Sequence, residues 1–266
     1  MVHVEFIGIP GSGKSTIHTL LVESFYRRKI PCLSMDQALL SCLKLKVDGI
    51  FFKCFLNVLP EKLALKYAPL VFTRSSLRYT AQNAFLSTNA RTVAAILSSD
   101  HFLTDEPHER ELVLSRFFLT ASQYHLIQEH TAEKIPVLFD EGFLQKSVSL
   151  FVSPGKRSLP SMTFLSSFLD LIPRPDIVLY LRAAPETCRQ RIVARSKGMP
   201  ERLAGKNPGE IQSYLDTYER CINSIIDLAT TKGFHISSID NNGRPEDIAY
   251  RLQQIIRSNT MTSEQV

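Results

Sequence analysis

The sequence predicts an α/β protein in which helices pack against a sheet of parallel strands. A glycine-rich loop near the N-terminus lies between a short β-rich segment at 2–7 and a segment with apolar residues at helical spacing. Apolar runs of strand length recur at 135–139, 177–181 and 234–239, and helical patterns separate them. Strands that alternate with helices are typical of α/β folds.

The glycine-rich loop reads GIPGSGKST and fits the phosphate-loop pattern G-x-x-x-x-G-K-[ST]. Backbone N–H groups of such a loop converge on phosphate oxygens, and the following helix adds the positive end of its dipole. Lys14 would reach the β- and γ-phosphates of a nucleoside triphosphate, and Ser15 would ligate Mg²⁺. The loop residues expected to contact the nucleotide are Gly8, Pro10, Gly11, Ser12, Gly13, Lys14, Ser15 and Thr16.

Composition limits the class of protein. The chain has 266 residues, with 44% hydrophobic and 21% charged residues, which is typical of a soluble globular protein. We expect one domain over 1–258 and a polar tail over 259–266. The net charge of +5 is too small to indicate a nucleic-acid partner. The five cysteines contain no C-x-x-C pair, so we expect buried free thiols in the cytoplasm. No apolar stretch is long enough to span a bilayer, so we expect no membrane partner.

Two carboxylates follow the apolar run at 135–139. A buried strand that ends in an acid is typical of the Walker B strand, so Asp140 is expected to hold the metal together with Ser15. Glu141 would orient or deprotonate the attacking group. Asp36 follows another expected strand, at 30–35, and is either a second candidate base or the cap of the next helix.

The segment from 37 to about 133 contains helical patterns and no convincing strand. It is longer than one crossover connection requires, so we interpret it as a helical insertion that builds a pocket for a second substrate. Four arginines in it would face an anionic substrate or lie on solvated helix faces, namely Arg74, Arg78, Arg110 and Arg116.

Arginines are concentrated after the apolar run at 177–181. A helix is expected to begin at Pro185, and Arg191 and Arg195 fall on one stripe of it. Arg189 lies on the same helix, and Arg202 follows in a loop. A basic, solvated helix is the alternative interpretation. Farther on, Asn207, Pro208 and Glu210 form the capping signature of another helix.

These motifs together resemble the nucleoside and nucleotide monophosphate kinases, and thymidylate kinase most of all. The resemblance depends on GIPGSGKST, VLFDEG, DIVLYLRAAPETCRQRIVAR and IDNNGRPEDIAYRLQQI. It implies a three-layer phosphate-loop fold with a five-stranded parallel sheet and an arginine-rich lid over about 189–206. It also implies ATP as donor, with Arg189, Arg191, Arg195 and Asn241 at the nucleotide. The resemblance is weak over 37–109.

Two departures from thymidylate kinases concern the acceptor. That family usually has an arginine at the position of Glu141, and it tends to have an acid at the position of Arg182. We therefore expect a phosphotransferase that moves the γ-phosphoryl group of Mg-ATP to a nucleotide, nucleoside or other small metabolite. A neutral hydroxyl would suit Glu141 or Asp36 as base.

Two other functions stay open. One is a nucleotide-hydrolysing switch that acts on a protein partner, although no N-K-x-D motif occurs. The other is a nucleotide-sugar kinase similar to zeta-type toxins. The sequence leaves open the acceptor, the choice of ATP or GTP, and the oligomeric state, for which a homodimer is one arrangement.

Overall fold

The computed structural model describes residues 1–47, 50–195 and 198–261. Its centre is a five-stranded parallel sheet in the order β2-β3-β1-β4-β5, which confirms the expected fold class. Strand β1 (Val2–Ile7) lies in the middle between β3 (Pro136–Phe139) and β4 (Ile177–Arg182). The edge strands are β2 (Leu33–Ser34) and β5 (Ile236–Asp240). The carboxyl ends of the strands therefore meet at one edge of the sheet.

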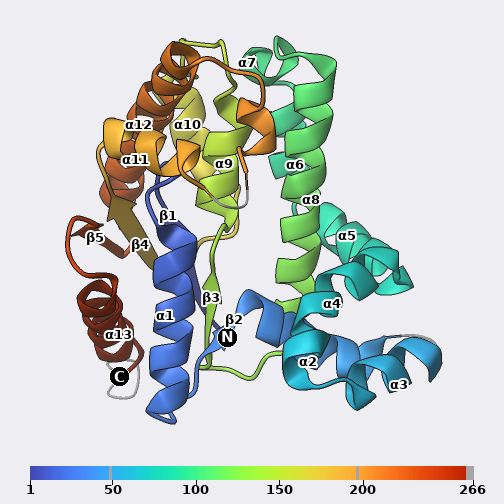
Figure 1. Cartoon of the computed structure of the whole chain (residues 1–266). Helices are drawn as coiled ribbons and strands as arrows, with labels where there is room; N and C mark the ends of the chain where they lie inside the picture. The colour runs from blue at the N-terminus through green and yellow to red at the C-terminus, as the bar shows by residue number, and fades with distance from the viewer. Residues whose placement is uncertain (48–49, 196–197, 262–266) are drawn as a thin grey trace.

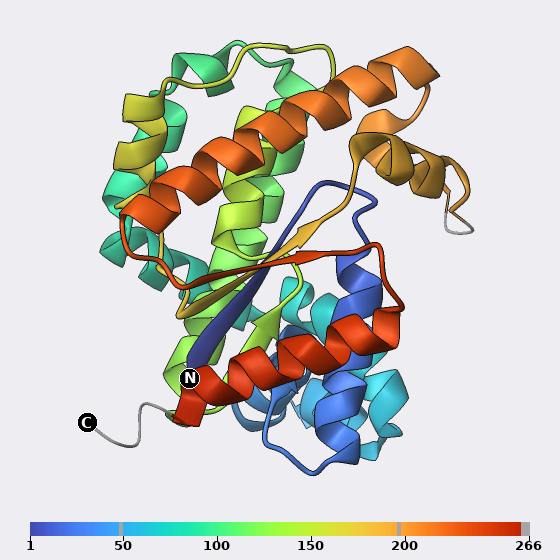
Figure 2. The same ribbon diagram turned by 90° about the vertical axis from the view of Figure 1, so that its left-hand side faces the viewer.

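Helices cover both faces of this sheet and give three layers. Helices α1 (Lys14–Arg27) and α13 (Pro245–Met261) lie side by side on one face (Figures 1 and 2). Alternate residues of β1 point to opposite faces, so Val4 and Phe6 pack in the cluster that contains α1 and α13. Ile7 packs in the larger cluster on the other face. Helix α13 continues to Met261, so the first part of the expected tail is helical, and 262–266 lie outside the described residues.

The other face carries α8 (Pro107–His130), α9 (Phe143–Phe151) and α12 (Pro208–Thr231). Phe143 of α9 packs on Phe117 of α8, with ring centroids 5.8 Å apart. Helix α12 begins with the expected capping box between Asn207 and Glu210. Near these helices lie α10 (Met162–Leu169), α11 (Pro185–Val193) and the 3₁₀ turn η1 (Glu201–Leu203).

The segment expected as a helical insertion is helical in its described residues, and 48–49 lie outside them. Its six helices before α8 are α2 (Met35–Lys46), α3 (Ile50–Val58), α4 (Glu61–Arg74), α5 (Ser76–Thr88), α6 (Ala90–Leu97) and α7 (Asp100–Leu103). Figure 1 shows that they extend away from the sheet on the side of α8.

Two local elements differ from the expectation. Strand β2 has only two residues because Ser34 already caps α2, with its side chain accepting the Gln37 N–H. Asp36 therefore lies in the first turn of α2, and it is neither at a strand end nor the cap. Helix α9 was not expected, because Gly142 precedes it where a capping side chain would be the usual sequence signal.

Candidate functional site

The phosphate loop connects β1 to α1 in the expected way. Gly13 has a left-handed backbone with φ of 93°, which favours glycine. A β-carbon on Gly13 would also collide with the side-chain amide of Asn241. That amide donates to the Ser12 carbonyl oxygen, so the turn after β5 helps to hold the loop in place.

The ammonium of Lys14 lies within the loop. It donates to the carbonyl oxygens of Gly8 at 2.7 Å and Ile9 at 3.3 Å. Burial lowers the pKa of Lys14, while Glu141 and Asp140 oppose the shift. Both hydrogen-bond acceptors are neutral, so the charge of Lys14 is available to an anion that approaches the loop.

Ser15 and Asp140 meet as the sequence predicts, with Ser15 Oγ donating to Asp140 Oδ2 at 2.9 Å. The other carboxylate oxygen of Asp140 is buried without a hydrogen-bond partner among the described residues. A hydroxyl and a carboxylate suit Mg²⁺, which takes its other ligands from phosphates and water. No cluster of three or more His, Cys, Asp or Glu suited to a metal occurs in the described residues. The pair therefore fits a Mg²⁺ that arrives with a nucleotide.

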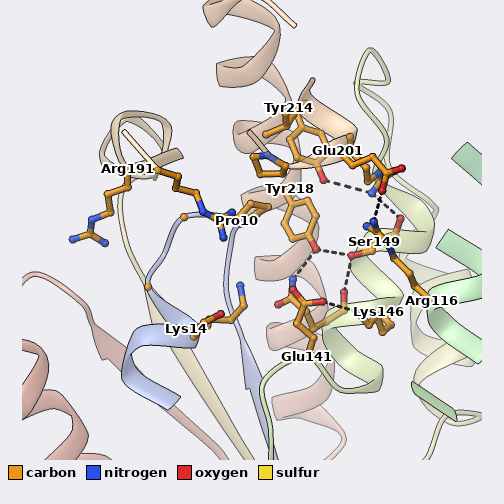
Figure 3. A pocket seen from close by; sticks show the side chains of 18 of the residues that line it. Pro10, Lys14, Arg116, Glu141, Lys146, Ser149, Arg191, Glu201, Tyr214 and Tyr218 are labelled. Carbon is orange, nitrogen blue, oxygen red and sulfur yellow. Dashed lines mark hydrogen bonds and ion pairs between the residues drawn. The ribbon is translucent and has the colours of Figure 1, made fainter. Parts of the chain in front are cut away.

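A cavity of about 430 Å³ lies beside the loop (Figure 3). It is bounded by the loop, α8, α9, α11, α12 and residues 200–203. The expected site residues that line it are Pro10, Gly11, Gly13, Lys14, Ser15, Thr16, Glu141, Arg116, Arg191 and Arg195. The fold thus brings together a loop, a carboxylate pair and an arginine helix that are far apart in the sequence.

Glu141 lies in the wall of this cavity and forms an ion pair with Lys146 (Figure 3). Loss of solvent would raise the pKa of its carboxyl, but Lys146 and Lys14 outweigh that effect and the net pKa is lowered. Glu141 is therefore ionised at neutral pH. An ionised carboxylate beside the phosphate loop has the charge state that a proton acceptor needs.

Two further ion pairs cross the cavity wall. Arg116 of α8 binds Glu201 of η1 at 2.7 Å, and Arg202 binds Glu109 of α8 at the same distance. Each basic side chain that α8, α9 and η1 contribute to the cavity thus faces a glutamate. By contrast, Lys14, Arg191 and Arg195 have no ion pair among the described residues.

Arg202 is not at the tip of an open lid, where the sequence suggested it. Its side chain is 8% exposed and donates to the carbonyl oxygens of Ser149 at 3.2 Å and Val152 at 2.9 Å. Residues 200–203 are therefore fastened to α8 and α9, and they close one side of the cavity. Residues 196–197 of the expected lid lie outside the described residues.

Gln145 links the loop to the cavity wall, and sequence reasoning missed it. Its side-chain oxygen accepts the Gly8 N–H at 3.0 Å, and its amide donates to Tyr218 Oη at 2.7 Å. Ser149 Oγ lies within hydrogen-bond distance of both the Gln145 carbonyl oxygen, at 3.2 Å, and Tyr218 Oη, at 2.9 Å. This chain of bonds fixes α9 and α12 relative to the phosphate loop.

Glu5 of β1 supplies the missing cap of α9. Its carboxylate accepts the Gln145 N–H at 3.0 Å, with Leu144 and Phe143 N–H groups adding to the interaction. A β-carbon on Gly142 would collide with Glu5, so glycine permits this close approach. Burial raises the pKa of Glu5 to about 8. An acid inside an apolar strand pattern is the signal that could have revealed this cap.

Several predicted residues lie elsewhere. Asp36 does not line the cavity, although Asp140 and His18 are close enough to affect its pKa. Arg189 forms an ion pair with Glu186 and lies outside the cavity lining. Of the four insertion arginines, only Arg116 lines the cavity, and α2–α7 contribute nothing to it. Asn241 contacts the loop, and Arg191 donates to its carbonyl oxygen at 3.4 Å.

Neither a scan of protein-family models nor a search of curated proteins found a match. Among solved structures, the chain is similar to a deoxyadenosine kinase from M. mycoides with the products dCMP and a flexible dCDP bound. The identity is 13% and the TM-score 0.42, over 96% of this chain and 98% of that chain. A likeness at this level concerns the course of the chain and carries no information on substrate.

Proposed function

We propose that this protein transfers the γ-phosphoryl group of Mg-ATP to a hydroxyl of a small molecule. The observation that carries the proposal is the contact between Ser15 and Asp140, beside Lys14 and at the edge of a cavity that contains an ionised glutamate. An enzyme that only hydrolyses a nucleotide with water needs no such cavity beside its phosphate loop, whereas a phosphotransferase must bind a second substrate there. A cavity of about 430 Å³ suits a small acceptor.

The side chains divide the work of the reaction between them. Lys14, Arg191 and Arg195 would stabilise the charge that develops on the transferred group, because phosphoryl transfer depends mainly on positioning and electrostatic stabilisation. Ser15 and Asp140 would hold Mg²⁺, which neutralises phosphate charge when it is bound. Glu141 would accept the proton of the acceptor hydroxyl. Its ion-pair partner is Lys146. Residues 200–203 would keep water from the cavity.

The charge balance of the cavity favours an acceptor without a phosphate. Arg116, Lys146 and Arg202 are each paired with a glutamate, so the acceptor side has little net charge to attract an anion. The unpaired cations lie on the loop, on α11 and just beyond its end, where ATP phosphates would bind. We therefore expect a nucleoside, sugar, polyol or amino alcohol rather than a nucleotide.

The test is a screen of ATP consumption in which each hydroxyl compound is paired with its own phosphate ester. ATP loss that depends on the uncharged member would support the proposal, and product mass would locate the new phosphate. ATP loss that depends only on the esters would overturn the acceptor class. ATP loss that is independent of any acceptor would favour the nucleotide-hydrolysing switch.

Glu141→Gln tests the base directly. Turnover should fall by about 10²–10⁴-fold, because the amide cannot accept the proton, while ATP affinity should be unchanged. Glu201→Gln is the matched control, since it changes another ion-paired glutamate of the same cavity and should cost far less. Equal losses in the two variants, or a parallel loss of ATP affinity, would remove Glu141 from the chemistry.

A further inference from the structure

Helices α3 and α4 expose a continuous apolar surface that the proposed reaction does not use. On α3, Phe51 is 75% exposed and Val58 is 83% exposed, and Phe55, which is half-buried, lies between them on the same face. On α4, the exposed stripe is Leu63, Tyr67 and Leu70. We call these six residues the α3–α4 patch.

Ring contacts join the two helices of the patch. Phe51 and Phe55 stack with centroids 6.2 Å apart, and Phe55 meets the edge of Tyr67 at 5.7 Å. The inner face of α3 is also apolar, with Leu56 fully buried. Exposed apolar side chains that gather in one place indicate a surface that a partner covers.

The described charges around the patch are mostly positive. Lys46, Lys53, Lys62 and Lys66 are exposed, and none has an ion pair among the described residues. Glu61 is the only acid that the structure describes between 44 and 70. A second copy docked through the same patch would bring lysines against lysines. An anionic surface would instead satisfy them.

We propose that the α3–α4 patch docks on an anionic lipid bilayer, with its apolar side chains in the interface and the lysines at the headgroups. Helix α3 has nine residues and cannot span a membrane, so the contact is peripheral. No helix in the described residues is long and apolar enough to cross a bilayer. Figure 1 places α3 at the corner opposite α11 and α12, so docking would leave these two helices away from the bilayer.

Vesicle sedimentation tests this docking in the full-length protein. The protein should bind vesicles of phosphatidylcholine mixed with phosphatidylglycerol and should release at high salt, because screening weakens the lysine contacts. Phe51→Ser combined with Val58→Ser should weaken binding at least about tenfold. Tyr26→Ser is the matched control, since Tyr26 of α1 is 79% exposed outside the patch, and its binding should be unchanged.

The lysines are tested by charge. Lys62→Glu with Lys66→Glu should weaken binding by more than about tenfold, whereas Lys62→Arg with Lys66→Arg should retain it, since each cation near an anionic surface contributes on the order of fivefold. Cys54 lies exposed on α3, so its thiol can be labelled with a polarity-sensitive fluorophore whose emission reports contact with the bilayer. The other thiols are buried or half-buried, and burial raises the pKa of Cys32 to about 12. The emission should shift to the blue with anionic vesicles.

Three results would overturn the docking proposal. They are no binding to anionic vesicles, equal binding by the serine double variant, and a dimer that this variant dissociates. The assay contains no nucleotide, and Lys14→Ala should sediment like the parent. Failure of vesicle binding therefore leaves the proposed phosphotransfer untouched, and failure of phosphotransfer leaves the docking untouched.

Discussion

The phosphate loop and the opposite wall of the cavity are held in place by different kinds of contact. The loop is one continuous segment whose shape depends on its own backbone, on Lys14 and on Asn241. The wall is assembled from α8, α9, η1 and α12, and side-chain bonds between distant residues join these elements. We therefore expect the loop to be sensitive to backbone change, whereas the opposite wall depends on ion pairs and hydrogen bonds.

The largest expected effect is in the loop. Gly13→Ala would place a β-carbon against Asn241 and would require a left-handed backbone in a non-glycine residue. Turnover should fall at least about 100-fold, because the donors that stabilise the transferred charge are displaced. Gly243→Ala is the control, since open space surrounds its β-carbon position. ATP titration calorimetry and turnover measure both; similar behaviour of the two variants would show that the loop tolerates backbone change.

The second prediction concerns Glu5, which joins β1 to the wall. The folded carboxyl keeps its proton up to about pH 8, whereas the unfolded chain loses it near 4.5, so unfolding releases a proton between these values. The free energy of unfolding should therefore fall as pH rises through this window, by roughly 5 kcal/mol in total. The adjacent His3 stays neutral there, because burial lowers its pKa to about 3.

Glu5→Gln removes this titration. The variant should match the parent near pH 4.5 and should be more stable than the parent at pH 8, as measured by urea unfolding at a series of pH values. Glu111→Gln, an exposed residue of α8, should leave the pH dependence unchanged. Parallel curves for parent and Glu5→Gln would show that Glu5 is ionised in the fold at neutral pH.

The smallest expected effects are on the free energy of unfolding, and they differ between Arg202 and Arg116, the two arginines that join η1 to α8. Arg202→Met should cost about 2–4 kcal/mol of unfolding free energy, because it leaves Glu109 and two part-buried carbonyl oxygens without their donor. Arg116→Met should cost less than about 1 kcal/mol, since Arg116 and Glu201 are 44% and 58% exposed. Equal losses in urea unfolding would mean that burial does not distinguish the two pairs.

Much of the phosphate-loop side of the cavity could be predicted from the sequence. Gly13, Lys14 and Ser15 are neighbours in the chain, and Asp140 follows a predicted strand that the structure places beside β1. The helical character of the insertion was also readable from its periodicity. Which helices of the insertion line the cavity could not be predicted, because only α8 among them contributes residues to it.

The free cysteines were expected to be buried, and the structure differs on this point. Three are buried, but Cys54 is exposed on α3 and Cys32 is half-buried. Helix α3 has apolar residues on more than one face, so its sequence does not predict which face packs inward. The same ambiguity hid the α3–α4 patch.

The sequence by itself determined the phosphate loop, because its geometry depends on residues that are neighbours in the chain. Only the tertiary structure decided the opposite wall. Arg116 meets Glu201 across 85 positions, Arg202 meets Glu109 across 93, and Gln145 meets Glu5 across 140. Contacts at such separations leave no local pattern, since they depend on how whole helices pack on the sheet. For that reason the sequence predicts the loop, and only the folded structure shows which side chains lie opposite it.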